Sequence, residues 1–395
     1  MRSAYASIAA LLVSVFGVLA GNGLMTTLLP VRAELEGFPG RDIGLMGSAY
    51  FAGMLAGAVL APWLVQRLGH IKAFGVSSAF GAGCILAFGL LVHPLSWILI
   101  RAVNGFFLAG IYAIVESYLQ GKAENRVRGR IVGIYSVVQY AGWAVGGQLM
   151  HLSEPTSFML FGIAAAIVMV FLVPLAGAAD ETRAPGAPAA RMNLRWLYRT
   201  APVGFVCVAM IGFANGPFWS LTPVYGVSLG LSGAAIGTLM SAITVGAAAF
   251  QFPVGRLSDA MDRRLVLILL TTLTACCEIV IYAFGTRLAG WPLILVGVVQ
   301  GGLLSTQYYV ASAYTNDRTG RANAVGVAAA LLFLYCVGAI VGPIIASLSM
   351  ERFGTSVLYL QNAGVHTALA IFVALRLRRS RAPRQAPAEF DLQPK

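Results

Sequence analysis

The sequence predicts an all-α integral membrane protein, with twelve transmembrane helices arranged as two pseudo-symmetric six-helix halves. Three observations support this fold class: the composition, the succession of apolar runs, and a repeat that relates the two parts of the chain. Of 395 residues, 58% are hydrophobic and 11% are charged, whereas a soluble domain carries about 25% charged residues. A chain of this composition requires a lipid environment.

Apolar runs of about 20 residues, the length that crosses a hydrocarbon core as a helix, follow one another along the chain. We expect spans at 5–30, 43–65, 72–92, 95–119, 130–150, 156–177, 200–224, 234–255, 264–285, 291–314, 323–347 and 355–377. The first resembles a secretory signal peptide, but eleven similar segments follow it. One polar connector separates six spans from six. The expected domains are therefore an N-terminal half (1–177), a connector (178–199), a C-terminal half (200–377) and a tail (378–395).

The basic residues predict how the chain lies in the membrane. Of the 27 Lys and Arg residues, 22 fall on loops of one side, and the other side carries Arg32, Arg41, Arg287 and Arg352. Cytoplasmic loops are enriched in Lys and Arg, so we expect both termini and the connector in the cytoplasm, in a multi-pass protein of a bacterial inner membrane. The net charge of +12 then reports orientation, and we expect no nucleic-acid partner.

The two halves repeat each other weakly. A shift of 193 residues aligns Ile43-Gly44 with Ile236-Gly237 and Gly53 with Gly246, without a gap. The same shift superimposes two turns, Pro62 to His70 on Gly255 to Arg263. Internal repeats of this kind are common in transporter folds.

These turns follow the second and eighth spans and carry a degenerate G-x-x-x-D-R-x-G-R pattern. This pattern resembles the signature loop of the major facilitator superfamily, whose fold has twelve spans in two halves. The first copy keeps Arg67 and Gly69, and the second keeps Gly255, Asp259 and Arg263. In that family the loop is a cytoplasmic latch, so the resemblance implies this role for the five residues. Gln66 stands where the first copy would have its aspartate, which puts that half of the latch in question.

The fourth span supports the resemblance. Its Arg101-x-x-x-Gly105 is similar to the R-x-x-x-G element of the superfamily, and its run Gly110 to Leu119, followed by Arg128-Gly129-Arg130, is similar to the YcaD-type bacterial subgroup. Antiporter subgroups usually carry a Gly-Pro pair in the fifth span, which is absent here. This absence weighs against a drug/proton antiporter.

Polar groups in the fourth span share one helix face. On a helical wheel, Arg101, Asn104, Tyr112 and Glu116 lie within a continuous sector. A charge at the bilayer centre costs about 2.5–3.5 kcal/mol on insertion scales, so such groups face protein or water. We predict that Arg101 serves the transport pathway or its coupling, with a clamp between helices as the alternative. Glu116 lies nearer the cytoplasmic end. We expect it to form a gate ion pair there with Arg67 or Arg126, and the alternative role is a protonation site.

Other spans are polar on one side. The predicted pathway residues there are Asn22, Gln139, Asn215, Trp219, Gln300 and Gln307. In the resembled family their spans line the central cavity, while the alternative is that each group joins neighbouring helices by hydrogen bonds. Glu278 and His366 also lie within spans, and for both we favour packing over function.

The sequence predicts no enzyme. We find no catalytic nucleophile, no metal-ligand spacing, no cofactor motif and no nucleotide-binding loop. The sequence predicts a monomeric secondary transporter that moves a small solute by alternating access. We expect a proton gradient to drive this transport. Two alternatives stay open: an antiporter of drugs or amphipathic compounds against protons, and a membrane sensor or scaffold that does not transport. A cavity of mixed character would suit uptake and export equally.

Overall fold

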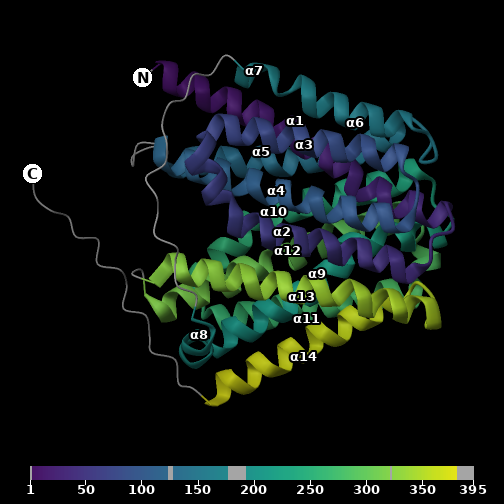
Figure 1. Ribbon diagram of the computed structural model, residues 1–395. Coiled ribbons are helices and arrows are strands. Elements are labelled where there is room, and N and C mark those ends of the chain that lie inside the picture. Colours follow the sequence, from purple (N-terminus) through teal and green to yellow (C-terminus); the bar gives the residue numbers. More distant parts are fainter. Residues whose placement is uncertain (1, 123–127, 177–192, 321–322, 380–395) are drawn as a thin grey trace, which may run out of the picture.

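The computed structural model describes residues 2–122, 128–176, 193–320 and 323–379, and these residues form helices with no strand among them. The elements are α1 (Arg2–Leu35), α2 (Gly40–Leu68), α3 (His70–Leu90), α4 (Pro94–Lys122), α5 (Arg128–Gln148), η1 (Leu149–His151), α6 (Met159–Val170), α7 (Val173–Ala176), α8 (Leu194–Thr200), α9 (Pro202–Ser228), α10 (Gly233–Ala260), α11 (Arg263–Leu288), α12 (Trp291–Thr319), α13 (Ala324–Phe353) and α14 (Val357–Arg379). The long helices form one bundle, and α1 begins and α14 ends at the same end of it (Figure 1). We call this the connector end, because α8 also lies there, and we call the opposite end the far end.

Among the described residues, ten helices are long and apolar enough to cross a membrane, and each corresponds to one of the expected spans. The remaining two expected spans correspond to α5 and to the pair α6 and α7. Helix α5 has 21 residues and is not among the ten; it contains Arg128, Arg130 and Gln139. The other span is interrupted after Val170, because Pro174 has no N–H to donate to the Val170 carbonyl four residues earlier.

The helices extend beyond the expected spans. Helix α1, for example, runs to Leu35, whereas the apolar run ends near residue 30. Hydropathy marks the part of a helix that lies in hydrocarbon, but backbone hydrogen bonding continues into the polar interface. The helix ends therefore differ from the expected span ends, while the order of the elements agrees.

The two halves pack in the same pattern. Helix α2 lies against α4 as α10 lies against α12, and α1 lies against α5 as α9 lies against α13. Helices α2 and α10 begin at Gly40 and Gly233, and α3 and α11 begin at His70 and Arg263. Both pairs of starting residues keep the offset seen in the sequence. The structure thus consists of two pseudo-symmetric helical halves, which is consistent with the twelve expected spans.

Glycines allow close backbone contact within each half. A Cβ at Gly57 would collide with the carbonyl oxygen of Phe106, and a Cβ at Gly246 would collide with that of Val298. Helices in lipid gain little from the hydrophobic effect between them, so they associate through tight van der Waals packing. These glycines therefore hold α2 on α4 and α10 on α12.

The halves meet at the far end, where the start of α2 packs on the end of α13 and the end of α5 packs on the start of α10. The residues of this far-end seam are mostly small: Gly44, Gly47, Ser48, Gly147, Ser220, Gly237, Ser241, Pro343 and Ser347. Ser48 donates a hydrogen bond to the Ile340 carbonyl at 2.6 Å, and Ser241 donates one to the Ala144 carbonyl at 2.7 Å. The seam closes the bundle at the far end.

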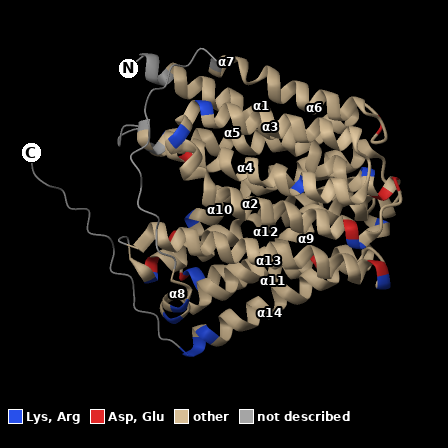
Figure 2. Cartoon of the chain, in the orientation of Figure 1, with Lys and Arg blue, Asp and Glu red and all other residues tan. Residues whose placement is uncertain are grey.

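Charged residues gather at the two ends of the bundle, and the band between them contains few of them (Figure 2). Large apolar side chains point outward along this band. Val59, Phe252 and Ile371 are 70%, 68% and 56% exposed. An apolar band bounded by charges is the surface that a bilayer covers.

Candidate functional site

A cavity of about 400 Å³ lies between the two halves. Helices α1, α2, α4 and α5 form its wall on one side, and their repeat partners α9, α10, α12 and α13 form it on the other. The lining residues are Thr26, Tyr50, Phe51, Met54, Tyr112, Tyr140, Trp143, Asn215, Trp219, Thr244, Ser305, Tyr308, Tyr309, Leu332 and Tyr335. The volume falls within the usual range for small-molecule sites, about 300–1,000 Å³.

The wall is aromatic and uncharged. Nine of the fifteen lining residues are Phe, Tyr or Trp, and none of the fifteen is Asp, Glu, Lys or Arg. The rings of Phe51 and Tyr335 meet across the two halves at 6.3 Å between centroids, and Trp143 donates a hydrogen bond to the Tyr112 hydroxyl at 3.0 Å. Such a wall offers ring faces together with hydroxyl and amide groups. It suits a solute that combines apolar or ring surface with hydrogen-bonding groups.

Three residues singled out in the sequence line this cavity: Tyr112 on α4 and Asn215 and Trp219 on α9. Sequence reasoning missed most of the other aromatic residues of the wall, including Tyr50, Tyr140 and Tyr309. The available signal was weak, because aromatic residues are equally common on helix faces that point to lipid. Only the packing of the helices shows which rings face inward.

Arg101 lies behind the cavity wall. Its side chain is 5% exposed, and the guanidinium lies 4.4 Å from the ring centroid of Tyr50, which lines the cavity. Its Nη1 donates to Asn104 Oδ1 at 3.4 Å, and Asn104 Nδ2 donates to Asn22 Oδ1 at 3.2 Å. The structure thus brings together three residues predicted from the sequence, on α1 and α4.

The charge of Arg101 is balanced by dipoles and a ring face. Within the described ranges, none of the ion pairs includes this arginine. A buried cation is costly unless its surroundings compensate it, and a cation over a Tyr face gains about 0.5–2 kcal/mol. Tyr50 and Asn104 supply this compensation. Arg101 can therefore act on the cavity through the ring that it supports.

Glu116 and Gln139 lie toward the connector end and do not line the cavity. Glu116 is exposed and interacts electrostatically with Tyr135 on α5 and with Tyr308 on the opposite half. Among the described residues, its ion pair with Arg67 is not formed. Arg126, the alternative partner, lies outside the described residues.

Gln300 and Gln307 face away from the cavity. Both are buried on α12, and Gln307 Nε2 donates a hydrogen bond to Thr274 Oγ1 on α11 at 2.9 Å. Gln300 lies beside Glu278, which is a second residue of α11. The one-sided polar pattern of α12 therefore turns toward its scaffold neighbour, while Tyr308 of the same helix turns to the cavity.

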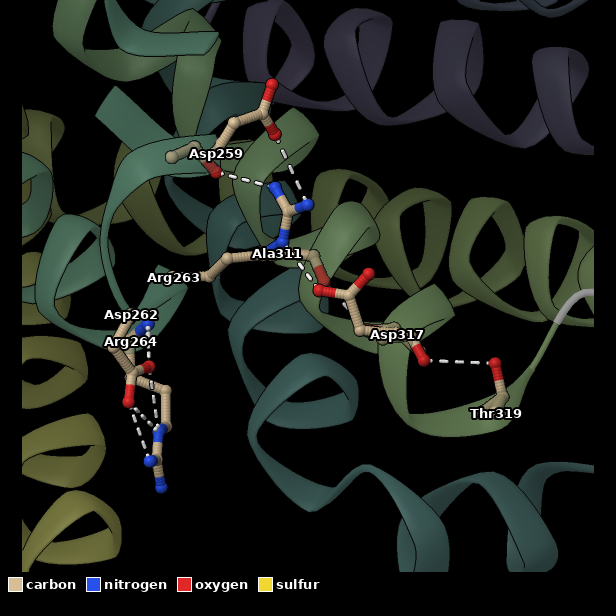
Figure 3. A network of polar contacts seen from close by, with 9 residues as sticks. Asp259, Asp262, Arg263, Arg264, Ala311, Asp317 and Thr319 are labelled. Atoms are coloured by element: carbon tan, nitrogen blue, oxygen red, sulfur yellow. Dashed lines mark hydrogen bonds and ion pairs between the residues drawn. The ribbon is translucent and has the colours of Figure 1, made fainter. Parts of the chain in front are cut away.

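The second signature turn forms an ionic network at the connector end (Figure 3). Arg263 pairs with Asp317 on α12 at 2.6 Å and with Asp259 at 3.4 Å. It also donates to the Ser258 hydroxyl at 2.8 Å. Asp259 and Arg263 were expected to act together, whereas Asp317 was not singled out. The network joins the end of α10 to the start of α11 and to α12.

Asp262 caps the start of α11. Its carboxylate accepts a hydrogen bond from the Arg264 backbone N–H at 2.9 Å, as an N-cap residue does. It also accepts from Arg264 Nη2 at 2.8 Å. The hydrogen bond from the Arg264 side chain is the main cause that holds the pKa of Asp262 below its usual value. Asp262 is thus a carboxylate well below neutral pH.

The first signature turn is held together differently. Gly69 ends α2 with φ of 77°, a conformation that favours glycine. Arg67 stacks on the Trp63 ring at 4.5 Å, and His70 shares a hydrogen bond of 3.1 Å with Ser117 on α4. Gly255, by contrast, lies inside α10 in open space. The complete ionic network therefore occurs, among the described residues, in the C-terminal half only.

Comparison with known proteins identifies the family. The Major Facilitator Superfamily model matches residues 11–232 and 204–395. An uncharacterized MFS-type transporter YcaD from Escherichia fergusonii is 28% identical over 364 residues, which cover 91% of this chain and 92% of the relative. The YcaD protein of Salmonella arizonae is 28% identical over 351 residues, covering 87% and 88%.

Solved structures show the same fold. The nucleoside transporter NupG, in a point-mutant form, superimposes with a TM-score of 0.81 at 13% identity, over 94% of this chain and all of the other. A D-xylose-proton symporter gives 0.71 at 14% identity, over 93% and 96%. Because the match to the family model spans almost the whole sequence, the chain belongs to the Major Facilitator Superfamily.

Proposed function

We propose that this protein is a proton-coupled secondary transporter of a small uncharged solute with an aromatic or apolar part and several hydrogen-bonding groups. The observation that carries the proposal is the cavity between the halves, whose wall is aromatic, hydroxyl-bearing and free of charged residues among those described. An uncharged wall disfavours an ion as the principal solute, because a desolvated charge would find no partner there. Nucleosides are one chemical class with these properties, and a nucleoside transporter shares the fold.

Alternating access is the mechanism that this architecture supports. Equivalent helices of both halves form the cavity, and the far-end seam closes one of its two approaches. With the connector end in the cytoplasm, as the positive-inside bias predicts, this conformation is closed to the outside. Opening the seam while the halves meet at the connector end would turn the same cavity outward. One chain supplies the whole cavity, so the transporter works as a monomer in the bacterial inner membrane.

Arg101 and Glu116 take different parts in this cycle. Arg101 fixes the orientation of Tyr50 and so shapes the solute site, whereas Glu116 stands at the cytoplasmic approach as a gate residue. The ionic network of Arg263 stabilises the C-terminal half at that approach in the manner of a latch. Asn215 and Trp219 bind the solute directly.

A thermal-stability screen of the purified protein tests the proposal. A bound solute stabilises the protein by RT ln(1 + [L]/Kd), about 2.7 kcal/mol at 100 times Kd. Nucleosides and other uncharged aromatic compounds should raise the melting temperature, and sugars and small anions should not. Trp219→Ala should abolish the shift, and Phe252→Ala, on the outer surface, should keep it. Stabilisation by small anions alone would overturn the uncharged-solute proposal.

The second candidate is an antiporter of amphipathic drugs, which the absence of charge among the described residues of the wall also favours. The same screen separates the two, because a drug antiporter would respond to lipophilic compounds of several shapes and only weakly to nucleosides. A sensor or scaffold would show a single arrangement of its halves under all conditions. Distances between spin labels at Glu36, directly after α1, and at Ser228, the last residue of α9, would then form one narrow population.

A further inference from the structure

A glutamate and a histidine form a buried pair outside the cavity. Glu278 lies in the middle of α11 and His366 in the middle of α14, and both side chains are 0% exposed. His366 Nδ1 and Glu278 Oε2 are 2.8 Å apart. Neither residue lines the cavity. The pair therefore belongs to the outer layer of the C-terminal half, where α11 and α14 pack together (Figure 1).

Because the pair is buried, the form with no net charge is favoured. Glu278 and His366 are together neutral when they hold one proton, whether it sits on the carboxylate or completes an imidazolium. Removing that proton would leave an isolated carboxylate, and adding another would leave an isolated imidazolium. Either net charge is strongly disfavoured without solvent. In the observed conformation the pair thus retains one proton and can release it only if water reaches it.

The surroundings of the pair are polar but uncharged. The titratable groups that face it are Cys277 on α11, Tyr359 on α14 and, behind Tyr359, Tyr225 on α9. Helix α12 presents the amide of Gln300. The contacts described for α10, α12 and α13 add no charged group. Among the described residues, therefore, no lysine or arginine stabilises the deprotonated pair.

His366 Nε2 has no hydrogen-bond partner among the described residues, and the Gln300 amide lies beside the Glu278 carboxylate. A pair that served only to clamp two helices would be expected to use its hydrogen-bonding capacity, since a buried unsatisfied atom costs about 1–3 kcal/mol. The unused hydrogen-bonding capacity of the pair therefore lies on an atom that can gain or lose a proton. This observation does not depend on how many protons the pair holds.

Polar side chains are spaced along the interface of α11 and α12 between the pair and the connector end, and we call them the polar stripe. On α11, Thr274 and Thr271 lie one and two turns from Glu278, and on α12 Gln307 and Tyr314 follow Gln300 at intervals of seven residues. Thr274 and Gln307 are hydrogen-bonded across the two helices at 2.9 Å.

The stripe ends at a pair of charged residues. Tyr314 interacts electrostatically with Arg264 and Asp262, which cap α11 at the connector end. Buried polar side chains therefore follow the interface of α11 and α12 from mid-membrane to its end.

We propose that the Glu278–His366 pair is a proton-binding site of this transporter, and that the stripe between α11 and α12 is the route by which it exchanges its proton with the connector end. This inference rests on the proposed function, because it supplies the coupling ion of the same cycle. A raised pH removes the proton, and the charged pair then favours a conformation in which the interface is hydrated. Protonation restores the neutral pair and the conformation described above.

The experiment measures the distance between spin labels at Glu36 and Ser228 in lipid nanodiscs at a series of pH values on both sides of neutrality. The wild type should show two distance populations whose ratio changes with pH. Glu278→Gln resembles the protonated carboxyl, so its ratio should stay at the low-pH value throughout. His366→Gln should also lose the pH response and serves if the first variant does not fold.

Two further variants separate a proton route from a helix clamp. Thr274→Val removes the hydroxyl of the stripe but leaves the pair intact. After a rapid pH change it should reach the same final ratio, about tenfold more slowly, as expected from a barrier higher by about 1.4 kcal/mol. Thr315→Val is the matched control, because Thr315 is equally buried and bonds only to its own helix at the Ala311 carbonyl. It should relax at the wild-type rate.

The outcomes are distinguishable. Two populations that do not respond to pH in the wild type, or a pH response that survives in both Glu278→Gln and His366→Gln, would overturn the proton site and leave the transporter intact. A wild-type rate in Thr274→Val would overturn the route. One narrow population in the wild type at every pH would instead refute transport itself.

Discussion

The substitution Gly44→Ala should open the far end of the protein. Gly44 lies in the far-end seam, and a Cβ there would collide with the side chain of Ser347 and the carbonyl oxygen of Pro343. The hydroxyl of Ser347 could rotate, but the backbone of α13 cannot move without separating the helices. The added methyl group therefore penalises only the conformation in which α2 and α13 are in contact.

The size of the effect follows from the cost of overpacking. An inserted carbon in a well-packed contact costs about 1–3 kcal/mol, which changes the ratio of two conformations about 5–150-fold. Alanine also favours the helix over glycine by about 1 kcal/mol. This gain is present in both conformations because α2 stays helical in each, so it does not alter their ratio.

The assay is again the distance between labels at Glu36 and Ser228, read as the fraction of molecules with the longer distance. Gly83→Ala is the matched control, since no atom lies within 4 Å of a Cβ at that position on α3. Gly57→Ala tests the reasoning from the other side: its collision with Phe106 lies within one half, so it should lower stability without a change in the ratio. Equal ratios in Gly44→Ala and Gly83→Ala would refute the argument.

Four more predictions test the topology, the solute site, the cytoplasmic gate and the capping of α11. Single cysteines at Ala187 and Gly37 should react with impermeant reagents from opposite sides, Gly37 from outside, and reaction of both from one side would contradict the twelve-span topology. Arg101→Lys should lower transport of the solute found in the stability screen, because lysine lacks the planar group that stacks on a ring, and unchanged transport in proteoliposomes would remove its special role. Glu116→Gln should alter the transport rate but keep accumulation against a gradient, whereas lost accumulation with intact exchange would make Glu116 a protonation site. The pKa of Asp262 is lowered in the folded protein, so its contribution to stability is complete above the ordinary carboxyl pKa of about 3.9 and disappears as the pH falls through the lowered value; thermal unfolding should show this acid loss in the wild type and not in Asp262→Asn.

The sequence was sufficient for the fold because each helix carries its own signal. An apolar run long enough to cross a bilayer needs no partner to be recognised, so the order of the elements follows from hydropathy alone. The break in the sixth span was not predicted, although Pro174 gives a local reason for it. The helices end in the polar interface of the membrane. Hydropathy does not distinguish helical from non-helical residues there, so it does not predict these ends.

The candidate site was less accessible to sequence reasoning, because a polar stripe indicates that a helix has a special face without indicating what that face contacts. The stripe of Arg101 and Asn104 was identified, but its contact with Asn22 depends on how α4 is rotated against α1. The stripe of Gln300 and Gln307 was equally clear, yet it faces α11. Glu278, for which packing was favoured from the sequence, lies 2.8 Å from His366 on α14, a contact between distant segments that no local pattern indicates.

The arginine behind the cavity wall has a consequence for selectivity. Its guanidinium lies 4.4 Å behind the ring of Tyr50, and no carboxylate among the described residues forms an ion pair with it. The dipoles around the guanidinium stabilise it without cancelling its net charge, so its positive potential extends through a low-dielectric wall into the space beyond. Cationic solutes of the right shape should therefore be repelled before they touch the aromatic surface, while the negative ends of neutral dipoles are drawn toward Tyr50. A single buried charge would thus orient the solute as well as filter it.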